Sequence, residues 1–318
     1  MPARITLAPE IAEFNARVTE AWRSHPALSS LSFPDARAVA EIVRRPWREG
    51  GPVMARTVER RIDLGEGALD VRVHVPVAGR ALPALIYLHG GGFTYFSLDT
   101  HDRLMREYAA AGGFAVIGVD YPLSPEARYP LALDLIVALV DWLEEQGGEL
   151  GIDPRRMAIG GDSAGANLSL AACLRRRDAG RPQAMRGMLF NYAAFTGACS
   201  DEAEAQHGGP DAVLNRDEMT FFFENYLSDP AQANDPYACP IGADLHDLPP
   251  ALLVIPEADL LAEQSYAMAE RFAAAGTAAH SIVYPGATHS FLEAMSIAPV
   301  ARQAIADGAA WVKDRLAD

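Results

Sequence analysis

The stretch Gly161-Asp162-Ser163-Ala164-Gly165 has the pattern G-x-S-x-G and separates two segments of different periodicity. Residues 156–160 before it form a short apolar run typical of a buried strand, and residues 164–177 after it carry apolar side chains at helical spacing. A strand, a sharp turn and a helix make a nucleophile elbow, whose strained turn holds a serine hydroxyl above the end of a sheet. Because G-x-S-x-G also occurs in plain turns, the interpretation needs a second motif.

A glycine-rich loop supplies that second motif. Residues 89–92 read His-Gly-Gly-Gly and follow the apolar run 83–88, which is typical of a buried strand. A serine nucleophile needs preorganised N–H donors for the oxyanion that forms when it attacks a carbonyl, and glycines let a substrate approach those donors. A phosphate-binding turn is the alternative, but neither G-x-G-x-x-G nor G-K-[ST] stands nearby.

A serine also needs a base, and the base needs an acid to orient it; in enzymes with such an elbow the acid precedes the histidine in the chain. Asp259 follows the predicted strand 251–256 and is the expected acid, with Glu257 as a competitor two residues away. His289 lies in the loop 285–291 after the last predicted strand and is the expected base. The remaining histidines are assigned elsewhere: His89 to the glycine loop, His280 to a structural position, and a last group to the cap, an early hairpin or surface loops, namely His25, His74, His101, His207 and His246.

The order of predicted elements indicates an α/β fold. Residues 55–64 and 68–76 predict an antiparallel hairpin. Strands then alternate with helices, which favours a mostly parallel sheet with helices on both faces: strands at 83–88, 114–119, 156–160, 187–192, 251–256 and 280–284, and helices near 100–111, 130–146, 164–177, 261–275 and 298–316.

Two segments fall outside this alternation and predict a helical cap. Residues 1–50 contain expected helices at 8–24 and 34–47, the second capped near Ser32. Within residues 51–318, the expected catalytic domain, about 193–248 lacks a core strand and contains an aromatic helix at 215–227. We expect aromatic side chains of the cap and of the loops to converge on the mouth of the site: Phe93, Tyr95, Phe96, Phe195, Phe221, Phe222, Phe223 and Phe291.

Composition restricts the partners. The chain has 318 residues, 50% of them hydrophobic, and a net charge of −15. An acidic surface argues against nucleic acid or an anionic membrane as partners, and no run of 18 apolar residues or secretory signal is present. Three widely spaced cysteines fit free thiols, so the expected location is cytoplasmic, and a monomer or a homodimer both remain open.

The combined motifs resemble those of the hormone-sensitive-lipase group of α/β-hydrolases, and finer matches resemble the bacterial acetyl esterases within it. The resemblance covers about residues 80–315 and rests on these segments: HGGG at 89–92, DYPLSPE at 120–126, GDSAG at 161–165, DLL at 259–261 and HSF at 289–291. It implies an α/β-hydrolase fold with an eight-stranded sheet, a helical cap, and ester hydrolysis without a metal or other cofactor.

The resemblance also implies roles for single residues. Ser163 would be the nucleophile, His289 the base and Asp259 the acid, and the N–H groups of Gly91, Gly92 and Ala164 would form the oxyanion hole. His89 and Glu126 would support the glycine loop from behind, with Tyr121 as a further candidate. Two departures stand out: Pro122 where the group often has arginine, and residues 263–265 (EQS) where it often has Asp-Glu-Gly.

The expected function is a serine carboxylesterase that hydrolyses short-chain acyl esters, acetyl to butyryl, through an acyl-enzyme. A hydrolase that cleaves amides or lactones with the same triad is the nearest alternative. A non-catalytic small-molecule receptor of the same fold is the alternative from another class, and it is disfavoured because such receptors typically lose a triad member, whereas Ser163, Asp259 and His289 are all present. A catalytic protein that also regulates a protein partner is compatible with these residues, although no segment indicates the partner.

Overall fold

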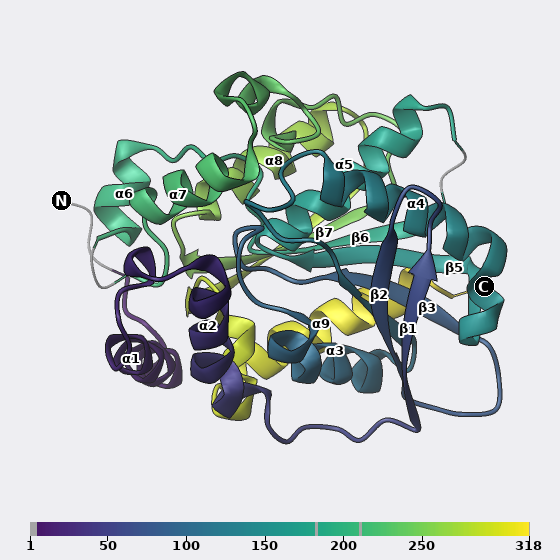
Figure 1. The fold of residues 1–318 in the computed structure, drawn as a ribbon, viewed down its shortest axis with the longest axis horizontal. Helices are drawn as coiled ribbons and strands as arrows, with labels where there is room; N and C mark the ends of the chain where they lie inside the picture. Colours follow the sequence, from purple (N-terminus) through teal and green to yellow (C-terminus); the bar gives the residue numbers. More distant parts are fainter. Residues whose placement is uncertain (1–4, 182–183, 210–211, 318) are drawn as a thin grey trace.

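The computed structural model describes residues 5–181, 184–209 and 212–317, and its centre is an eight-stranded sheet in the order β1-β2-β4-β3-β5-β6-β7-β8 (Figure 1). The first two strands and the β2–β4 pair are antiparallel, and every later pair is parallel. The predicted α/β-hydrolase architecture is thus confirmed. The strands are β1 (Arg56–Asp63), β2 (Ala68–Val75), β3 (Leu82–Leu88), β4 (Ala115–Asp120), β5 (Ile152–Asp162), β6 (Met185–Asn191), β7 (Ala251–Ala258) and β8 (Ala279–Thr288).

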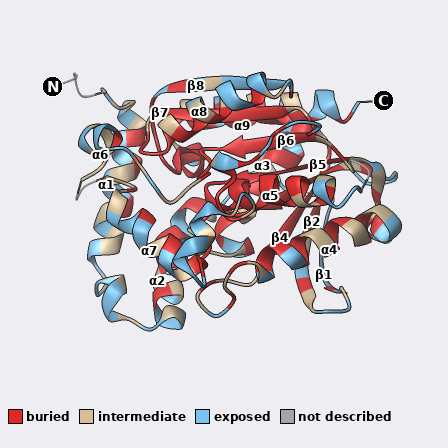
Figure 2. Ribbon diagram, turned by 90° about the horizontal axis from the view of Figure 1, so that it is seen from above, coloured by how far each residue is buried: buried red, intermediate tan, exposed pale blue. Residues whose placement is uncertain are grey.

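Helices cover both faces of the sheet because side chains alternate along each strand. Ile86 and Ile117 point into the core shared with one set of helices, and Leu85 and Val116 into the core shared with the other. The first set is α4 (Leu131–Gln146), α5 (Ala164–Asp178) and α8 (Ala262–Ala274); the second is α3 (Leu98–Gly112) and α9 (Pro299–Arg315). In Figure 2 the central strands are almost entirely buried.

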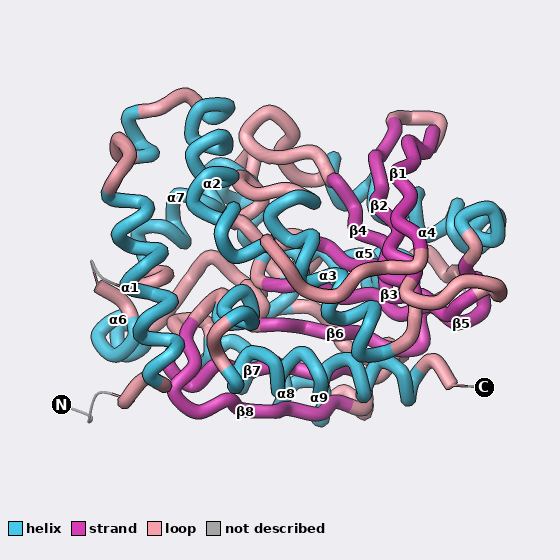
Figure 3. Tube along the Cα trace, turned by 90° about the horizontal axis from the view of Figure 1, so that it is seen from below, coloured by secondary structure: helices cyan, strands magenta, loops and turns pink. Residues whose placement is uncertain are grey.

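Four further helices gather beside one end of the sheet, as Figures 1 and 3 agree. These helices are α1 (Pro9–Arg23), α2 (Phe33–Arg48), α6 (Asp201–His207) and α7 (Arg216–Tyr226). The hydroxyl of Ser32 accepts a hydrogen bond from the Asp35 N–H, so Ser32 is the N-cap residue of α2, as predicted. The sequence predicted only α7 in the inserted segment, whereas α6 also forms there, with Ser200 at its N-cap. We interpret the four helices as the cap.

Short 3₁₀ helices complete the chain: η1 (Leu28–Ser30), η2 (Gly147–Leu150), η3 (Pro230–Asn234), η4 (Pro240–Gly242) and η5 (Phe291–Ser296). Two strands are longer than predicted: β5 begins at Ile152 and not at residue 156, and β8 continues to Thr288 where a loop from residue 285 was expected. Pairing of Thr288 with Ala258 of β7 extends the strand past Pro285 and Gly286. None of the helices in the described part of the chain combines the length and the apolar character needed to cross a bilayer.

Candidate active site

The turn between β5 and α5 holds Ser163 in a backbone conformation that side chains rarely adopt. Its φ is 52° and its ψ is −115°, and its N–H donates to the carbonyl of Asn191 at 2.9 Å. Gly165 makes this turn possible, because a Cβ at that position would lie 1.9 Å from the Leu88 carbonyl oxygen. The G-x-S-x-G pattern therefore lets α5 pack directly against the end of β3.

His289 and Asp259, which follow β8 and β7, meet Ser163 at the same edge of the sheet, where β5 ends. The His289 Nε2 atom lies 3.1 Å from Ser163 Oγ, and His289 Nδ1 lies 2.9 Å from Asp259 Oδ2. The other carboxylate oxygen of Asp259 accepts the N–H of Leu261 at 2.9 Å, which fixes the rotamer of the carboxylate. Glu257, the competitor, instead accepts the N–H of Gly286 at 3.0 Å, so the acid in contact with His289 is Asp259.

The glycine loop presents two backbone N–H groups beside Ser163. Gly91 has a φ of 117° and Gly92 a φ of 59°. A Cβ on Gly91 would lie 2.2 Å from the Tyr95 carbonyl oxygen, which explains why only glycine fits. Among the residues that the structure describes, neither of these two N–H groups donates to a protein acceptor. Ala164 is the first residue of α5, where backbone N–H groups lack helical partners, and it lines the same cavity as Gly91 and Gly92.

His89 packs behind the glycine loop. Its Nδ1 lies 2.7 Å from the Gly90 carbonyl oxygen, and its ring stacks on Tyr121 with centroids 4.5 Å apart. The Tyr121 hydroxyl donates to the His89 carbonyl oxygen at 2.7 Å. Burial, reinforced by the positive charge of His101, lowers the pKa of His89 from 6.5 to about 4, so the ring is neutral and Nδ1 carries the proton that Gly90 accepts.

Glu126, which was predicted to support the glycine loop from behind, contacts Arg37 and not the loop itself. Its carboxylate is exposed and receives two hydrogen bonds from Arg37 of α2, at 3.0 and 2.6 Å. The same guanidinium donates to the carbonyl oxygens of Thr94 and Ser124 at 2.9 Å. Arg37 has five N–H donors, so it can bind Glu126 and the two carbonyl oxygens at the same time. Glu126 thus orients the arginine that connects α2 to the segment after the glycine loop.

A buried ion pair beneath the elbow was missed from the sequence. The carboxylate of Asp162 lies 3.3 Å from His101 Nε2 and accepts the Tyr87 hydroxyl at 2.9 Å. Burial disfavours the charged form of both residues, but the charge and the hydrogen bond of the partner outweigh this effect. The pKa of His101 is therefore raised and that of Asp162 is lowered. The assignment of His101 to the cap, the hairpin or a surface loop was wrong: spacing with Leu98, Met105 and Tyr108 places it on the buried face of α3.

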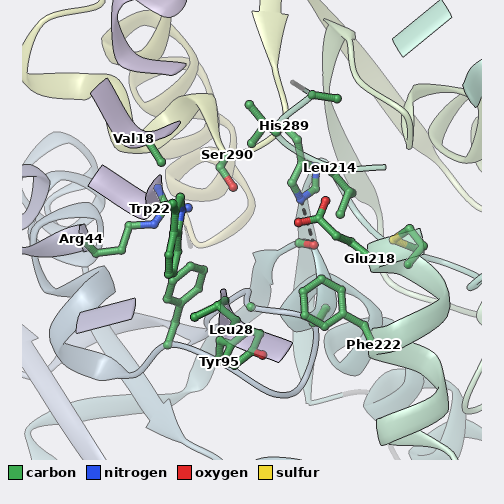
Figure 4. A pocket seen from close by; sticks show the side chains of 18 of the residues that line it. Val18, Trp22, Leu28, Arg44, Tyr95, Leu214, Glu218, Phe222, His289 and Ser290 are labelled. Carbon is green, nitrogen blue, oxygen red and sulfur yellow. Dashed lines mark hydrogen bonds between the residues drawn. The ribbon is translucent and has the colours of Figure 1, made fainter. Parts of the chain in front are cut away.

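Ser163, His289 and the glycine loop line a cavity of about 570 Å³ between the sheet and the cap helices. Figure 4 shows this cavity with Val18 and Trp22 of α1 opposite Glu218 and Phe222 of α7. Of the predicted aromatic residues, five line it: Phe93, Tyr95, Phe96, Phe222 and Phe223. The other three do not: Phe195 and Phe291 are fully buried and pack against Phe190 and Tyr192, and Phe221 stacks on Phe33 and Tyr95 outside the cavity.

An α/β sheet with a serine, a histidine and an aspartate at its strand ends defines the class of serine-dependent α/β-hydrolases. A family model described as the alpha/beta hydrolase fold matches residues 85–293. The chain therefore belongs to this family and to its hormone-sensitive-lipase group, as the sequence motifs predicted.

Solved esterase structures are similar over nearly the whole chain. A hyperthermophilic esterase from the archaeon Pyrobaculum calidifontis is 30% identical, with a TM-score of 0.89 over 98% of this chain and 99% of its own. A thermostable carboxylesterase cloned from a metagenomic library is 31% identical, with a TM-score of 0.86 over 91% of this chain and 99% of its own. A thermostable esterase from Pseudomonas putida is 28% identical, with a TM-score of 0.89 over 98% of each chain.

Proposed function

We propose that this chain is a serine carboxylesterase that hydrolyses short-chain acyl esters through an acyl-enzyme. The observation that carries the proposal is the continuous hydrogen-bond chain from Ser163 Oγ through His289 to Asp259, at 3.1 and 2.9 Å. The esterase relatives support the same reaction class.

The geometry fits a two-step mechanism. Ser163 Oγ attacks the ester carbonyl while His289 Nε2 takes its proton, and the Nδ1–H of His289 donates to Asp259. The oxyanion accepts hydrogen bonds from the N–H groups of Gly91, Gly92 and Ala164. His289 protonates the leaving alkoxide, which leaves the acyl group on Ser163. Water, deprotonated by the same histidine, then releases the acid and restores the serine.

The position of Phe222 supports a preference for acetyl to butyryl groups. A Cβ on Gly92 would lie 2.2 Å from the Phe222 ring, so this ring covers the loop that holds the carbonyl oxygen. Tyr95 packs against Phe222 at a centroid distance of 5.9 Å and limits the space further. A pocket closed by aromatic rings selects against long chains because the rings occupy the volume those chains need. The rest of the cavity then accommodates the alcohol part.

One assay series tests both parts of the proposal. We expect the purified protein to hydrolyse nitrophenyl esters with a maximum at two to four acyl carbons, and Ser163→Ala to lower turnover by a factor on the order of 10⁴ to 10⁶. Circular dichroism of the variant checks that it remains folded. Retained activity in Ser163→Ala refutes the nucleophile, and a maximum at eight carbons or more refutes the short-chain preference. Amides and lactones are assayed beside the esters, and we expect them to be hydrolysed more slowly; faster hydrolysis of either would favour the nearest alternative.

A further inference from the structure

Glu218 is a carboxylate inside the cavity that the proposed mechanism does not use. It lies in the first turn of α7, and the residues of this helix that line the cavity have spacings i, i+1, i+4 and i+5, namely Glu218, Met219, Phe222 and Phe223. Its side chain is exposed to solvent and lines the cavity wall. Figure 4 shows the carboxylate pointing from α7 towards His289.

The hydrogen bonds of Glu218 leave one carboxylate oxygen available. Oε2 accepts the N–H of Asn215 at 3.1 Å, and Asn215 Oδ1 accepts the N–H of Glu218 at 3.0 Å, so the two residues form a capping box. No hydrogen bond to Oε1 and no ion pair with a cationic side chain is present in the described part of the chain. The capping box fixes the carboxylate in place while Oε1 remains free for a ligand.

Arg44 also lines the cavity, but its guanidinium is paired with Glu293, so it does not offset the charge of Glu218. Burial raises the pKa of the Glu218 carboxyl, and so does Asp217, while the Asn215 N–H and His289 act in the opposite direction. A cationic ligand would supply the opposite charge that is missing here. Aromatic faces of Trp22, Tyr95 and Phe222 line the same cavity, and such faces also attract ammonium groups.

The direction of Glu218 indicates which half of the ester carries that charge. His289 protonates the leaving alcohol in the proposed mechanism, so the alcohol part lies on the side of the cavity next to His289. Glu218 points to that side, whereas Phe222 restricts the acyl side next to Gly92. We propose that Glu218 selects esters whose alcohol part carries an ammonium group, as in esters of amino alcohols. This inference rests on the proposed esterase function.

Charge-isosteric substrates test the inference. We expect wild-type protein to prefer acetylcholine over its neutral isostere 3,3-dimethylbutyl acetate, and Glu218→Gln to lower kcat/KM for the charged ester about tenfold. The neutral ester should change less than about twofold, because glutamine retains the capping box. Asp217→Asn is the matched control: it removes the same charge from the same helical turn, at an exposed residue that does not line the cavity.

Each outcome has one meaning. Equal losses for both esters in Glu218→Gln, or an equal loss of preference in Asp217→Asn, overturn the role of Glu218. A second pair of substrates places the charge on the acyl part: 4-(trimethylammonio)butyrate and 5,5-dimethylhexanoate esters of one alcohol. A preference for the charged ester in this pair alone overturns the assignment to the alcohol side. If the wild-type protein hydrolyses neither these esters nor nitrophenyl acetate, the proposed function itself is refuted.

Discussion

At the scale of single residues, the two carboxylates after β7 have different partners. Asp259 contacts the imidazole of His289, and its side chain is fully buried. Glu257 accepts the N–H of Gly286 and so stabilises the path of β8. In an extended chain the side chains of residues two apart point to the same side, so position alone left both Glu257 and Asp259 as candidates.

Replacement of the two carboxylates should therefore have different effects. We expect Asp259→Asn to lower kcat by about 10⁴ with little change in KM, because an amide favours the wrong tautomer of His289. Glu257→Gln should retain most of the activity, since the amide oxygen still accepts the Gly286 N–H. Steady-state kinetics on one nitrophenyl ester measures both variants. The reverse pattern would make Glu257 the orienting acid.

The sequence was informative about residues whose role depends on a local pattern. Ser163 and Gly91 lie in short motifs whose chemistry requires those residue types in that order. The pairing of Asp162 with His101 was not predictable in this way, because the residues are 61 positions apart and meet only when α3 packs on the sheet. The helical spacing of His101 with Leu98 and Met105 did indicate a buried position, and that signal was available.

At the scale of elements, α2 is joined to the segment after His289 by a buried ion pair. Arg44 and Glu293 are 2.6 Å apart, and each side chain is 5% exposed. The Arg44 guanidinium also lies over the Phe96 ring, 4.8 Å from its centroid. The two halves of a buried pair depend on each other, because either charge alone would lack a partner in a low-dielectric environment.

Arg44→Met should reduce the free energy of unfolding by about 3–5 kcal/mol, the usual result of leaving one buried charge unpaired. Arg44→Met combined with Glu293→Leu should recover much of this loss, because it removes both charges. Urea denaturation monitored by tryptophan fluorescence measures the three proteins. A loss below about 1 kcal/mol in the single variant would mean that Glu293 is neutral or solvated there.

The existence of α2 was predictable from its cap and its periodicity, but its position against Glu293 was not. Ser32 and Pro34 mark the start of the helix locally, since a capping side chain and a proline at N1 or N2 suffice. The direction in which the helix packs depends on contacts with residues about 250 positions later, which no local pattern encodes. The same reason explains why Phe195 and Phe291 were placed in the cavity although they pack in the core.

At the scale of the whole molecule, the buried histidines link stability to pH. The pKa of His89 falls from 6.5 to about 4 on folding. Between these values the unfolded chain binds a proton that the folded chain does not, so this contribution to stability is lost as the pH falls. His101 has a raised pKa and acts in the opposite direction, with a contribution that is present below pH 6.5 and lost as the pH rises through its folded pKa.

His89→Asn should make the stability less sensitive to acid. Asparagine keeps an N–H donor for the Gly90 carbonyl but does not titrate. Between pH 6.5 and 4 the free energy of unfolding of the wild-type protein should fall by about 3 kcal/mol more than that of the variant. Chemical denaturation at several pH values compares the two slopes, whatever the variant's absolute stability. Parallel slopes would show that the ring is protonated in the folded protein.

The contacts between the N-terminal helices and the His289 segment have a consequence for how the chain is made. The Ala8 N–H donates to the Gly286 carbonyl, and Asn15 and Arg44 contact Thr288 and Glu293. A ribosome adds about 5–20 residues per second, so α1 and α2 are synthesised roughly ten seconds to a minute before their partners. During that interval Phe14 and Trp47 can pack against each other, but the faces of α1 and α2 that contact η5 have no partner yet. The final docking of α1 and α2 therefore waits until η5 has been made.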